Sequence, residues 1–429
     1  MKVLYTLIVL FIAFASNSFA QSLNMRLNHY FYTWERADSI GGSSITHLRG
    51  YQNLSFDVSG KQWSFNTWMQ TGEDFANEIG RGFEYTLYNA YLKGSNLFGF
   101  MDMKLGRQYV YAGVGKGPLD GLLLKFKAGK KKEVQFTAYG GFNTPVNYDF
   151  KEYGSLNNDF FAGASIGYYG MQGLVANLSY MDRHRKPVSY TAPRLDSAFN
   201  TIEILIEPDS KQYTLAGFDF NYAYKQMFGT YGKLFYDLNR KVLYRGEINA
   251  SYATGPVRFS AGYLYREPLM SYNTIFWTFT HKENQEIEGA IDYSFKNGFN
   301  LYGKLADVIF DDDNSLRYQI GFNSPNYGLS YIGYSGSAGN SNGFSAYGAY
   351  QLVEEILSGN ASVNYSNYYL GTFEKEKSNA LSGTLGLTYR PNRQISIDAQ
   401  GQILTNKDYS YDTRFLLGIN YWLFSNLNR

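Results

Sequence analysis

The sequence predicts an all-β protein: a transmembrane antiparallel β-barrel of about 22 strands (range 18–22) without a plug domain. Three observations lead to this prediction. Apolar and polar residues alternate with a period of two along most of the chain, which is the period of a β-strand. The composition, with 41 Tyr, 44 Gly and only 9 Pro, suits many strands joined by turns. The connections between the alternating runs are short and long in turn, as in outer-membrane barrels.

The clearest sample of the pattern is the segment 100–128. Apolar residues occupy every second position in 101–105 and again in 122–128, with Asp and Lys among the residues between them. A Gly-rich stretch containing Pro118 separates the two runs, and we expect it to be a turn or loop from Gly113 to Gly121. The segment therefore predicts a β-hairpin with one apolar and one polar face.

The same alternation predicts strands along the rest of the chain, interrupted by two long connections at 182–211 and 268–284. The further runs are 25–36, 48–58, 63–70, 84–92, 134–142, 160–169, 174–180, 218–222, 231–238, 243–252, 257–265, 287–295, 299–306, 316–322, 329–334, 344–352, 357–365, 381–389, 395–403 and 415–423.

Such strands must close on themselves if they cross a membrane. Hydrocarbon offers no partner to a backbone N–H or C=O group, so an open sheet edge would leave a row of them unsatisfied. An apolar strand face fits lipid, and a face of Ser, Thr, Asn, Gln and charged residues fits a wet lumen. A secreted soluble all-β protein, such as a propeller or a large sandwich, is the alternative, because its strands also alternate.

The first twenty residues have the features of a secretory signal peptide. A basic start at Lys2 precedes an apolar run from Val3 to Phe14, and Ser18 to Ala20 supplies small residues for cleavage. We therefore expect residues 1–20 to be removed and residues 21–429 to form a single barrel domain in the cell outer membrane.

Composition also excludes several classes of function. The chain has no Cys, which rules out disulfides and thiol chemistry, and a net charge of +2 gives no reason to expect nucleic acid as a partner. Only four His are present, and no two of them have metal-ligand spacing. We expect no enzyme activity, no cofactor and no metal site.

Charged residues on the polar strand faces are the candidates for lining a pore, where rings of charge select solutes. These pore-lining candidates are Lys104, Arg107, Asp120, Lys125, Lys127, Arg245, Glu247, Arg258, Glu286, Glu288, Asp292, Lys304, Arg317, Asp398 and Arg414. Alternatively, they pair across neighbouring strands and hold a hydrated wall together, for example Glu286 and Glu288 with Arg258 or Lys304. Arg107 shares the phase of Leu105, so either Gly106 begins a bulge or the strand leaves the bilayer there.

Two segments resemble known proteins. Phe415 to Phe424 is similar to the C-terminal insertion strand of Gram-negative outer-membrane proteins, although five residues follow Phe424 here. The residues Leu105-Gly106-Arg107-Gln108 and, after a loop, Asp120-Gly121-Leu122 resemble the hairpin of alginate-export-like and related porins. This resemblance implies passive passage of a polar or charged solute, with Arg107 at the pore near the outer end of its strand.

Together these observations predict a porin-like channel for passive diffusion of small polar or charged solutes. Its expected partners are outer-membrane lipid, lipopolysaccharide and a small polar or anionic solute, with a homotrimer or partner barrel-complex subunits also compatible with the sequence. The alternative functions are a barrel subunit or scaffold of a surface-assembly, secretion or export complex and, less favoured, an outer-membrane enzyme.

Overall fold

A computed structural model shows the fold, and it describes residues 22–38, 44–76, 82–148, 153–274, 276, 279, 282–311, 313–336, 339–370 and 376–426. The expected signal peptide at 1–20 lies outside these residues. Twenty-four strands are formed, and no α-helix is assigned within the described ranges. No helix in this part of the chain is long and apolar enough to cross a membrane.

The strands follow one another with little else between them. They are β1 (Ser22–Asp38), β2 (Ser44–Ser59), β3 (Trp63–Ala76), β4 (Glu84–Leu97), β5 (Met101–Ala112), β6 (Gly115–Ala128), β7 (Val134–Asn143), β8 (Asp159–Tyr168), β9 (Leu174–Arg185), β10 (Tyr190–Leu195), β11 (Thr201–Ile206), β12 (Lys211–Tyr224), β13 (Phe228–Asp237), β14 (Val242–Thr254), β15 (Val257–Arg266), β16 (Asn284–Ser294), β17 (Asn300–Phe310), β18 (Asp313–Asn323), β19 (Tyr327–Gly336), β20 (Gly339–Val353), β21 (Leu357–Leu370), β22 (Ser378–Asn392), β23 (Ile395–Thr405) and β24 (Tyr409–Asn426).

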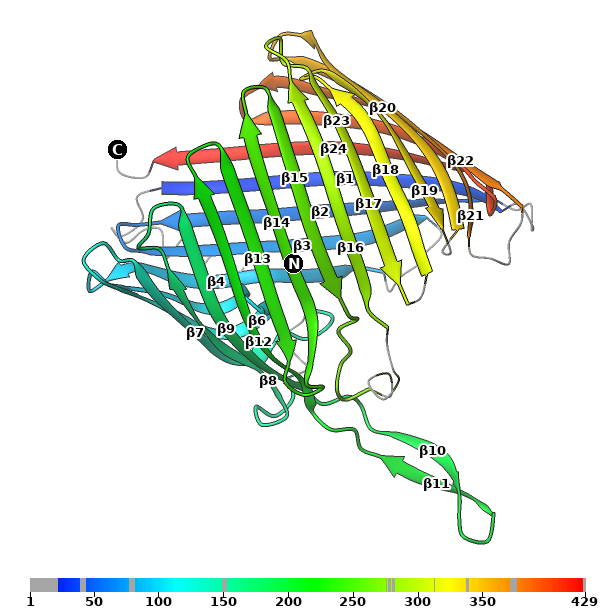
Figure 1. Cartoon of the computed structure of the whole chain (residues 1–429). Helices are drawn as coiled ribbons and strands as arrows, with labels where there is room; N and C mark the ends of the chain where they lie inside the picture. The colour runs from blue at the N-terminus through cyan, green and yellow to red at the C-terminus, as the bar shows by residue number, and fades with distance from the viewer. Residues whose placement is uncertain are drawn as a thin grey trace.

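Twenty-two of these strands form one closed antiparallel barrel, which confirms the predicted fold class and strand number (Figure 1). Each strand pairs with the next along the chain, except that β9 pairs with β12 and leaves out β10 and β11. The barrel closes where β1 pairs with β24, from Ser22 opposite Asn426 to Asp38 opposite Tyr409. Closure leaves the sheet without a free edge, as a strand-built membrane protein requires.

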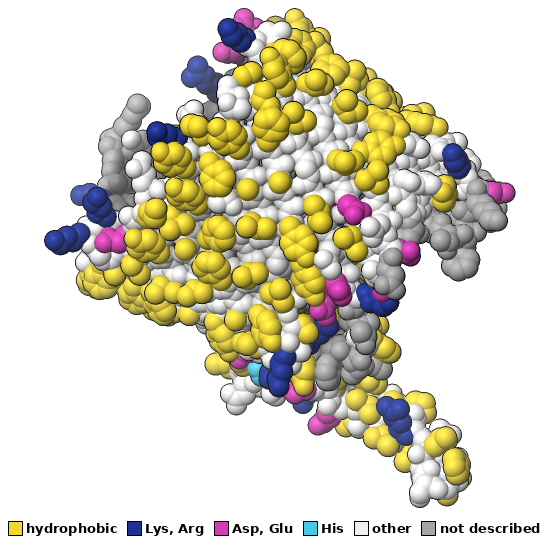
Figure 2. Space-filling view, viewed as in Figure 1, with side chains coloured by type: hydrophobic (Ala, Val, Ile, Leu, Met, Phe, Trp, Pro, Cys, Tyr) yellow, Lys and Arg dark blue, Asp and Glu magenta, His cyan; other side chains and the backbone are white. Residues whose placement is uncertain are grey.

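The outer surface of the barrel is apolar. In Figure 2, hydrophobic side chains cover the visible wall, and most charged side chains lie toward its margins. Alternate strand residues carry this surface: Leu381, Leu385, Leu387 and Tyr389 on β22 are all exposed, Leu385 to 64%. The intervening residues therefore point to the interior, as the period-two pattern predicts.

The two ends of the barrel differ in their connections. At one end, here called the turn end, ten connections run from two residues (255–256) to five (129–133). The other end, the loop end, carries the long connections 144–158 and 267–283, so the predicted asymmetry is present. The alternation is not strict, because 113–114, 311–312 and 337–338 at the loop end hold only two residues each.

Two hairpins depart from the barrel wall. The predicted loop from Gly113 to Gly121 is wrong: β5 continues to Ala112 and β6 begins at Gly115, so only two residues turn. Residues 108–118, here called the inner hairpin, pair only with each other. The strands β10 and β11 with their turn, residues 190–206 and here called the outer hairpin, form a separate two-stranded sheet that projects away from the barrel (Figure 1).

Candidate functional site

The inner hairpin leaves the wall where local backbone geometry bends β5. Gly106 has a φ of 122°, a conformation that favours glycine, and a Cβ at this position would meet the backbone of Ala90 on β4. The pairing of β5 with β4 ends one residue later, at Arg107 opposite Ala90. The sequence pattern left open a bulge at Gly106 or a strand that leaves the bilayer at Arg107; in the structure β5 instead leaves the wall here and turns into the barrel.

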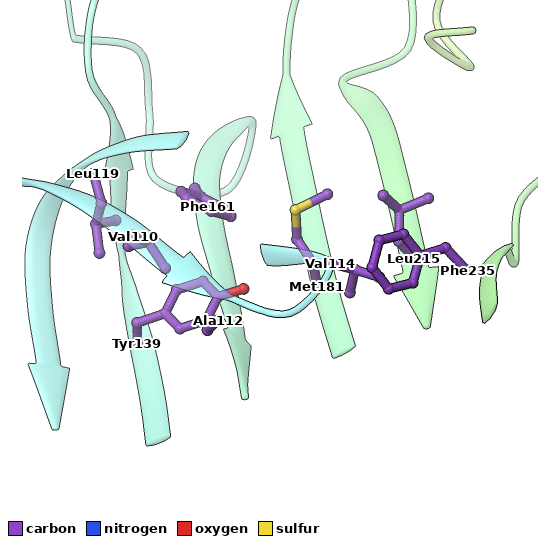
Figure 3. Close-up of a cluster of buried hydrophobic side chains, with 9 residues drawn as sticks. All are labelled: Val110, Ala112, Val114, Leu119, Tyr139, Phe161, Met181, Leu215 and Phe235. Atoms are coloured by element: carbon purple, nitrogen blue, oxygen red, sulfur yellow. The ribbon is translucent and has the colours of Figure 1, made fainter. Parts of the chain in front are cut away.

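Apolar side chains hold the inner hairpin against the inside of the barrel. Val110, Ala112 and Val114 pack with residues from five strands in one buried cluster (Figure 3). The wall side of the cluster consists of Tyr139 on β7, Phe161 on β8, Met181 on β9, Leu215 on β12 and Phe235 on β13.

These wall residues have the same strand phase as polar residues such as Thr137 and Ser179, opposite to the exposed Phe136 and Leu178. They therefore point inward. The backbone N–H of Val114 donates to Ser179 Oγ at 3.0 Å and fixes the tip. The inner hairpin thus lies along the inside of the wall over β7 to β13 and takes up part of the lumen.

A buried ion pair closes the base of the inner hairpin. Arg107, on β5, donates from Nε and Nη2 to the two carboxylate oxygens of Asp120, on β6, at 2.8 and 2.7 Å. Arg107 is 2% exposed and also donates to the backbone oxygens of Leu87 and Tyr148. Such bidentate contacts are geometrically specific. Arg107 differs from the expected position at the outer end of its strand: it is enclosed in the wall and lies within β5.

The connection between β7 and β8 completes this enclosure. Thr144 Oγ1 donates to Asp120 at 3.1 Å, and the Tyr153 hydroxyl donates to Asp120 at 2.5 Å while accepting from Arg107 at 3.0 Å. Burial raises the pKa of Tyr153, so the phenol keeps its proton at neutral pH and can donate it to the carboxylate. Arg107 and Asp120 therefore form a fixed ion pair where the inner hairpin leaves the wall, and they are not free charges.

A cavity of about 450 Å³ lies between the inner hairpin and the turn end. Lys93, Lys104 and Lys125 line it, together with Tyr109 and Tyr111 from the exposed side of the inner hairpin. The two tyrosine rings lie 4.4 Å apart, and the Lys104 ammonium lies 5.0 Å from the ring centroid of Tyr91. Among the described residues, Lys104 and Lys125 form no ion pair, whereas Lys127 lies 2.6 Å from Asp102.

Several other predicted site residues pair with one another along the wall. Arg245 and Glu247 on β14 contact each other at 2.6 Å. Arg317 on β18 reaches Glu286 at 2.5 Å and Glu288 at 2.9 Å. The partner of these glutamates is thus Arg317, and not Arg258 or Lys304, because Ala306 on β17 lies opposite both Glu288 and Arg317.

The remaining candidates are spread around the barrel. Arg414 pairs with Asp412 at 2.8 Å, and Asp398 accepts from Thr388 at 2.7 Å and from Asn420 at 2.5 Å. Arg258 and Asp292 lie opposite each other in register, and Lys304 lies on β17, but none of these three forms an ion pair with another described residue.

Sequence reasoning missed Lys93, Tyr109 and Tyr111, which share the cavity with Lys104 and Lys125. Lys93 lies one residue beyond the predicted run 84–92, and the two tyrosines lie between the run 101–105 and the predicted loop, where no strand was assigned. Within the described ranges no cluster of His, Cys, Asp or Glu has the arrangement of a metal site.

No family model matches the chain, and no curated protein matches it. Solved structures similar to it include OccAB4 of Acinetobacter baumannii, at 10% identity and a TM-score of 0.44, covering 96% of this chain and 100% of that one. OpdK of Pseudomonas aeruginosa with vanillate has 10% identity and a TM-score of 0.45 over 95% and 100% of the two chains. The P pilus usher PapC translocation pore has 8% identity and a TM-score of 0.43 over 94% and 99%.

All three TM-scores lie below 0.5. The likenesses therefore carry no argument about what this chain does, which has to come from its own residues. The resemblance of the Gly106-Arg107-Gln108 hairpin to alginate-export-like porins gains no support from these comparisons.

Proposed function

We propose that the chain, after removal of residues 1–20, forms an outer-membrane channel for passive diffusion of small polar or charged solutes. The closed barrel with an apolar outer surface supports a position in lipid. The inner hairpin gives the channel a constriction, and charged and polar side chains of the wall give it a wet lining. The observation that carries the proposal is the cavity beside this constriction, with its unpaired lysines.

The charges at this cavity favour anions. Lys93, Lys104 and Lys125 outnumber Asp102 and Asp219 in its lining, and Lys127 engages Asp102. A lumen of low-dielectric walls focuses the field of such charges, which raises the local concentration of solutes of opposite sign. The channel should therefore pass anions more readily than cations.

Planar-bilayer recordings of the purified protein test the function and its selectivity. Under a salt gradient, the wild-type reversal potential should indicate anion preference, and the double variant K104E/K125E should shift it toward cations. The control K130E/K131E makes the same charge change on the exposed connection 129–133 and should shift it less, because salt screens charges outside the narrow lumen. A barrel that conducts no ions would contradict the proposed function; equal shifts in both variants would contradict the role of the cavity.

A further inference from the structure

A second site lies on the inner wall formed by β1 to β4, where polar residues meet in register on three rows. Ser55 lies opposite Arg26 and Trp68, and Trp68 lies opposite Asn89. Two further rows lie two residues away on either side. One consists of Asn28, Asn53 and Gln70, and the other consists of Asn24, Asp57, Asn66 and Tyr91. Since neighbouring strands lie about 4.8 Å apart, the four strands make a patch roughly 14 Å wide.

The patch is hollowed around one tryptophan. Two adjoining hollows, of about 330 and 370 Å³, share Arg26, Ser55 and Trp68. Trp68 is 42% exposed, and its ring stacks on Tyr88 at 4.1 Å, which holds the indole in place. An indole so fixed offers a flat apolar surface among hydrogen-bonding groups.

The hydrogen-bonding groups of the patch are mostly uncharged. An amide side chain both donates and accepts, which matches a hydroxyl group that does the same. The two charged members already have partners: Arg26 lies over the Trp422 ring at 5.8 Å, and Asp57 accepts from Ser59.

The patch also lies at the level of the constriction. Asn89, opposite Trp68, precedes Ala90, which is opposite Arg107 at the base of the inner hairpin. The Tyr88 ring, which stacks on Trp68, is 5.4 Å from the ring of Tyr148, whose backbone oxygen accepts from Arg107. A solute that passes the inner hairpin would therefore pass Trp68.

We propose that this patch, Trp68 with the surrounding amides of β1 to β4, binds a neutral saccharide. The C–H face of a sugar ring would stack on the exposed indole, and its hydroxyls would bond to the amides and to Ser55. Burial of the apolar face of the sugar ring supplies the attraction, and the amides supply hydrogen-bonding groups that complement the sugar hydroxyls. The inference rests on the proposed function, since it names a class of solute for the same channel.

Titration calorimetry of the detergent-solubilised protein with maltotriose and with cellotriose tests the site without requiring conduction. The wild type should bind at least one of these probes, and Trp68→Ala should weaken binding about tenfold. Trp68→Phe, which keeps an aromatic ring and disturbs folding less, should weaken binding by a smaller factor.

The matched control is Trp63→Ala. Trp63 lies on the same strand and is 41% exposed, but it shares the phase of the exposed Phe65 and so points outward. This variant should bind as the wild type does. If neither trisaccharide binds the wild type, or if Trp63→Ala weakens binding as much as Trp68→Ala, the saccharide site is overturned. A protein that conducts ions but binds no saccharide would contradict the saccharide site and leave the proposed channel function standing. A protein that binds saccharide but conducts no ions would contradict the channel function and leave the saccharide site standing.

Discussion

The inner and outer hairpins are the same kind of element, but one packs inside the barrel and the other projects away from it. Each is a two-stranded ribbon that extends beyond the barrel wall and carries alternating apolar residues. Val110 of the inner hairpin is 0% exposed, whereas Leu205 of the outer hairpin is 58% exposed and Phe199 at its tip 82%. The inner hairpin packs against the inside of the wall, whereas no residue of the outer hairpin belongs to the buried cluster found in the described part of the chain.

The difference lies in what each hairpin meets. The inner hairpin bends at Gly106, is tied by Arg107 and Asp120, and finds inward-pointing apolar residues on β7 to β13. The outer hairpin joins β9 to β12 through segments that carry it away from the wall. Alternation alone does not position a hairpin; a bend, an anchor and an apolar receiving surface do.

The largest effect is expected from removing the inner hairpin. Replacing residues 109–117 by a two-residue turn should raise single-channel conductance severalfold, because the element that takes up part of the lumen is gone. Deleting residues 190–206 of the outer hairpin, as the control, should leave conductance unchanged. Bilayer recordings of both variants measure this, and an unchanged conductance in the first would mean that the inner hairpin does not limit the ion path.

Breaking the anchor should have the next largest effect. Arg107→Ala leaves the largely buried Asp120 without its charge partner and should lower the free energy of unfolding by about 3–5 kcal/mol. Arg317→Ala, which removes a more exposed arginine from Glu286 and Glu288, should cost about 1 kcal/mol or less. Guanidinium unfolding followed by tryptophan fluorescence compares the two, and similar losses would contradict the anchoring role of Arg107.

Truncating a packed leucine should lower the free energy of unfolding by an amount similar to or smaller than that for Arg107→Ala. Leu119, the residue that follows the inner hairpin on β6, belongs to the same buried cluster, so Leu119→Ala opens a cavity there and should cost about 2–5 kcal/mol. Leu205→Ala removes the same atoms from an exposed side chain and should change stability by no more than about 0.5 kcal/mol. The same unfolding experiment measures both variants. Equal effects would mean that the inner hairpin is not packed against the wall as described.

Much of the barrel could be predicted from the sequence because a membrane-facing strand repeats every two residues. The alternation of Leu122, Leu124 and Phe126 against Leu123, Lys125 and Lys127 is enough to assign a strand and its two faces. The break in alternation at Arg107 indicated either a bulge at Gly106 or a strand that leaves the bilayer, whereas the hairpin turns into the barrel. Its direction could not be predicted, because Val110, Ala112 and Val114 would suit a lipid face as well as an inward one.

The candidate site was harder to predict, because register decides which side chains meet. Glu286 and Glu288 could have paired with Arg258 or Lys304, yet the offset of β16, β17 and β18 brings Arg317 to them. Likewise, Asn53, Ser55, Trp68 and Asn89 are isolated polar or aromatic residues in the sequence, and only their alignment across β2, β3 and β4 makes a patch of them.

The sequence by itself determined the all-β class, the strand number and the two faces of each strand, because these depend on a local period and on the need to satisfy every backbone group by closure. Tertiary structure alone decided that a hairpin packs inside the barrel, that Arg107 pairs with Asp120, and that the lysines of β4, β5 and β6 share a cavity with Tyr109 and Tyr111. The physical reason is that these features depend on contacts between strands far apart in the chain, which a period of two cannot encode.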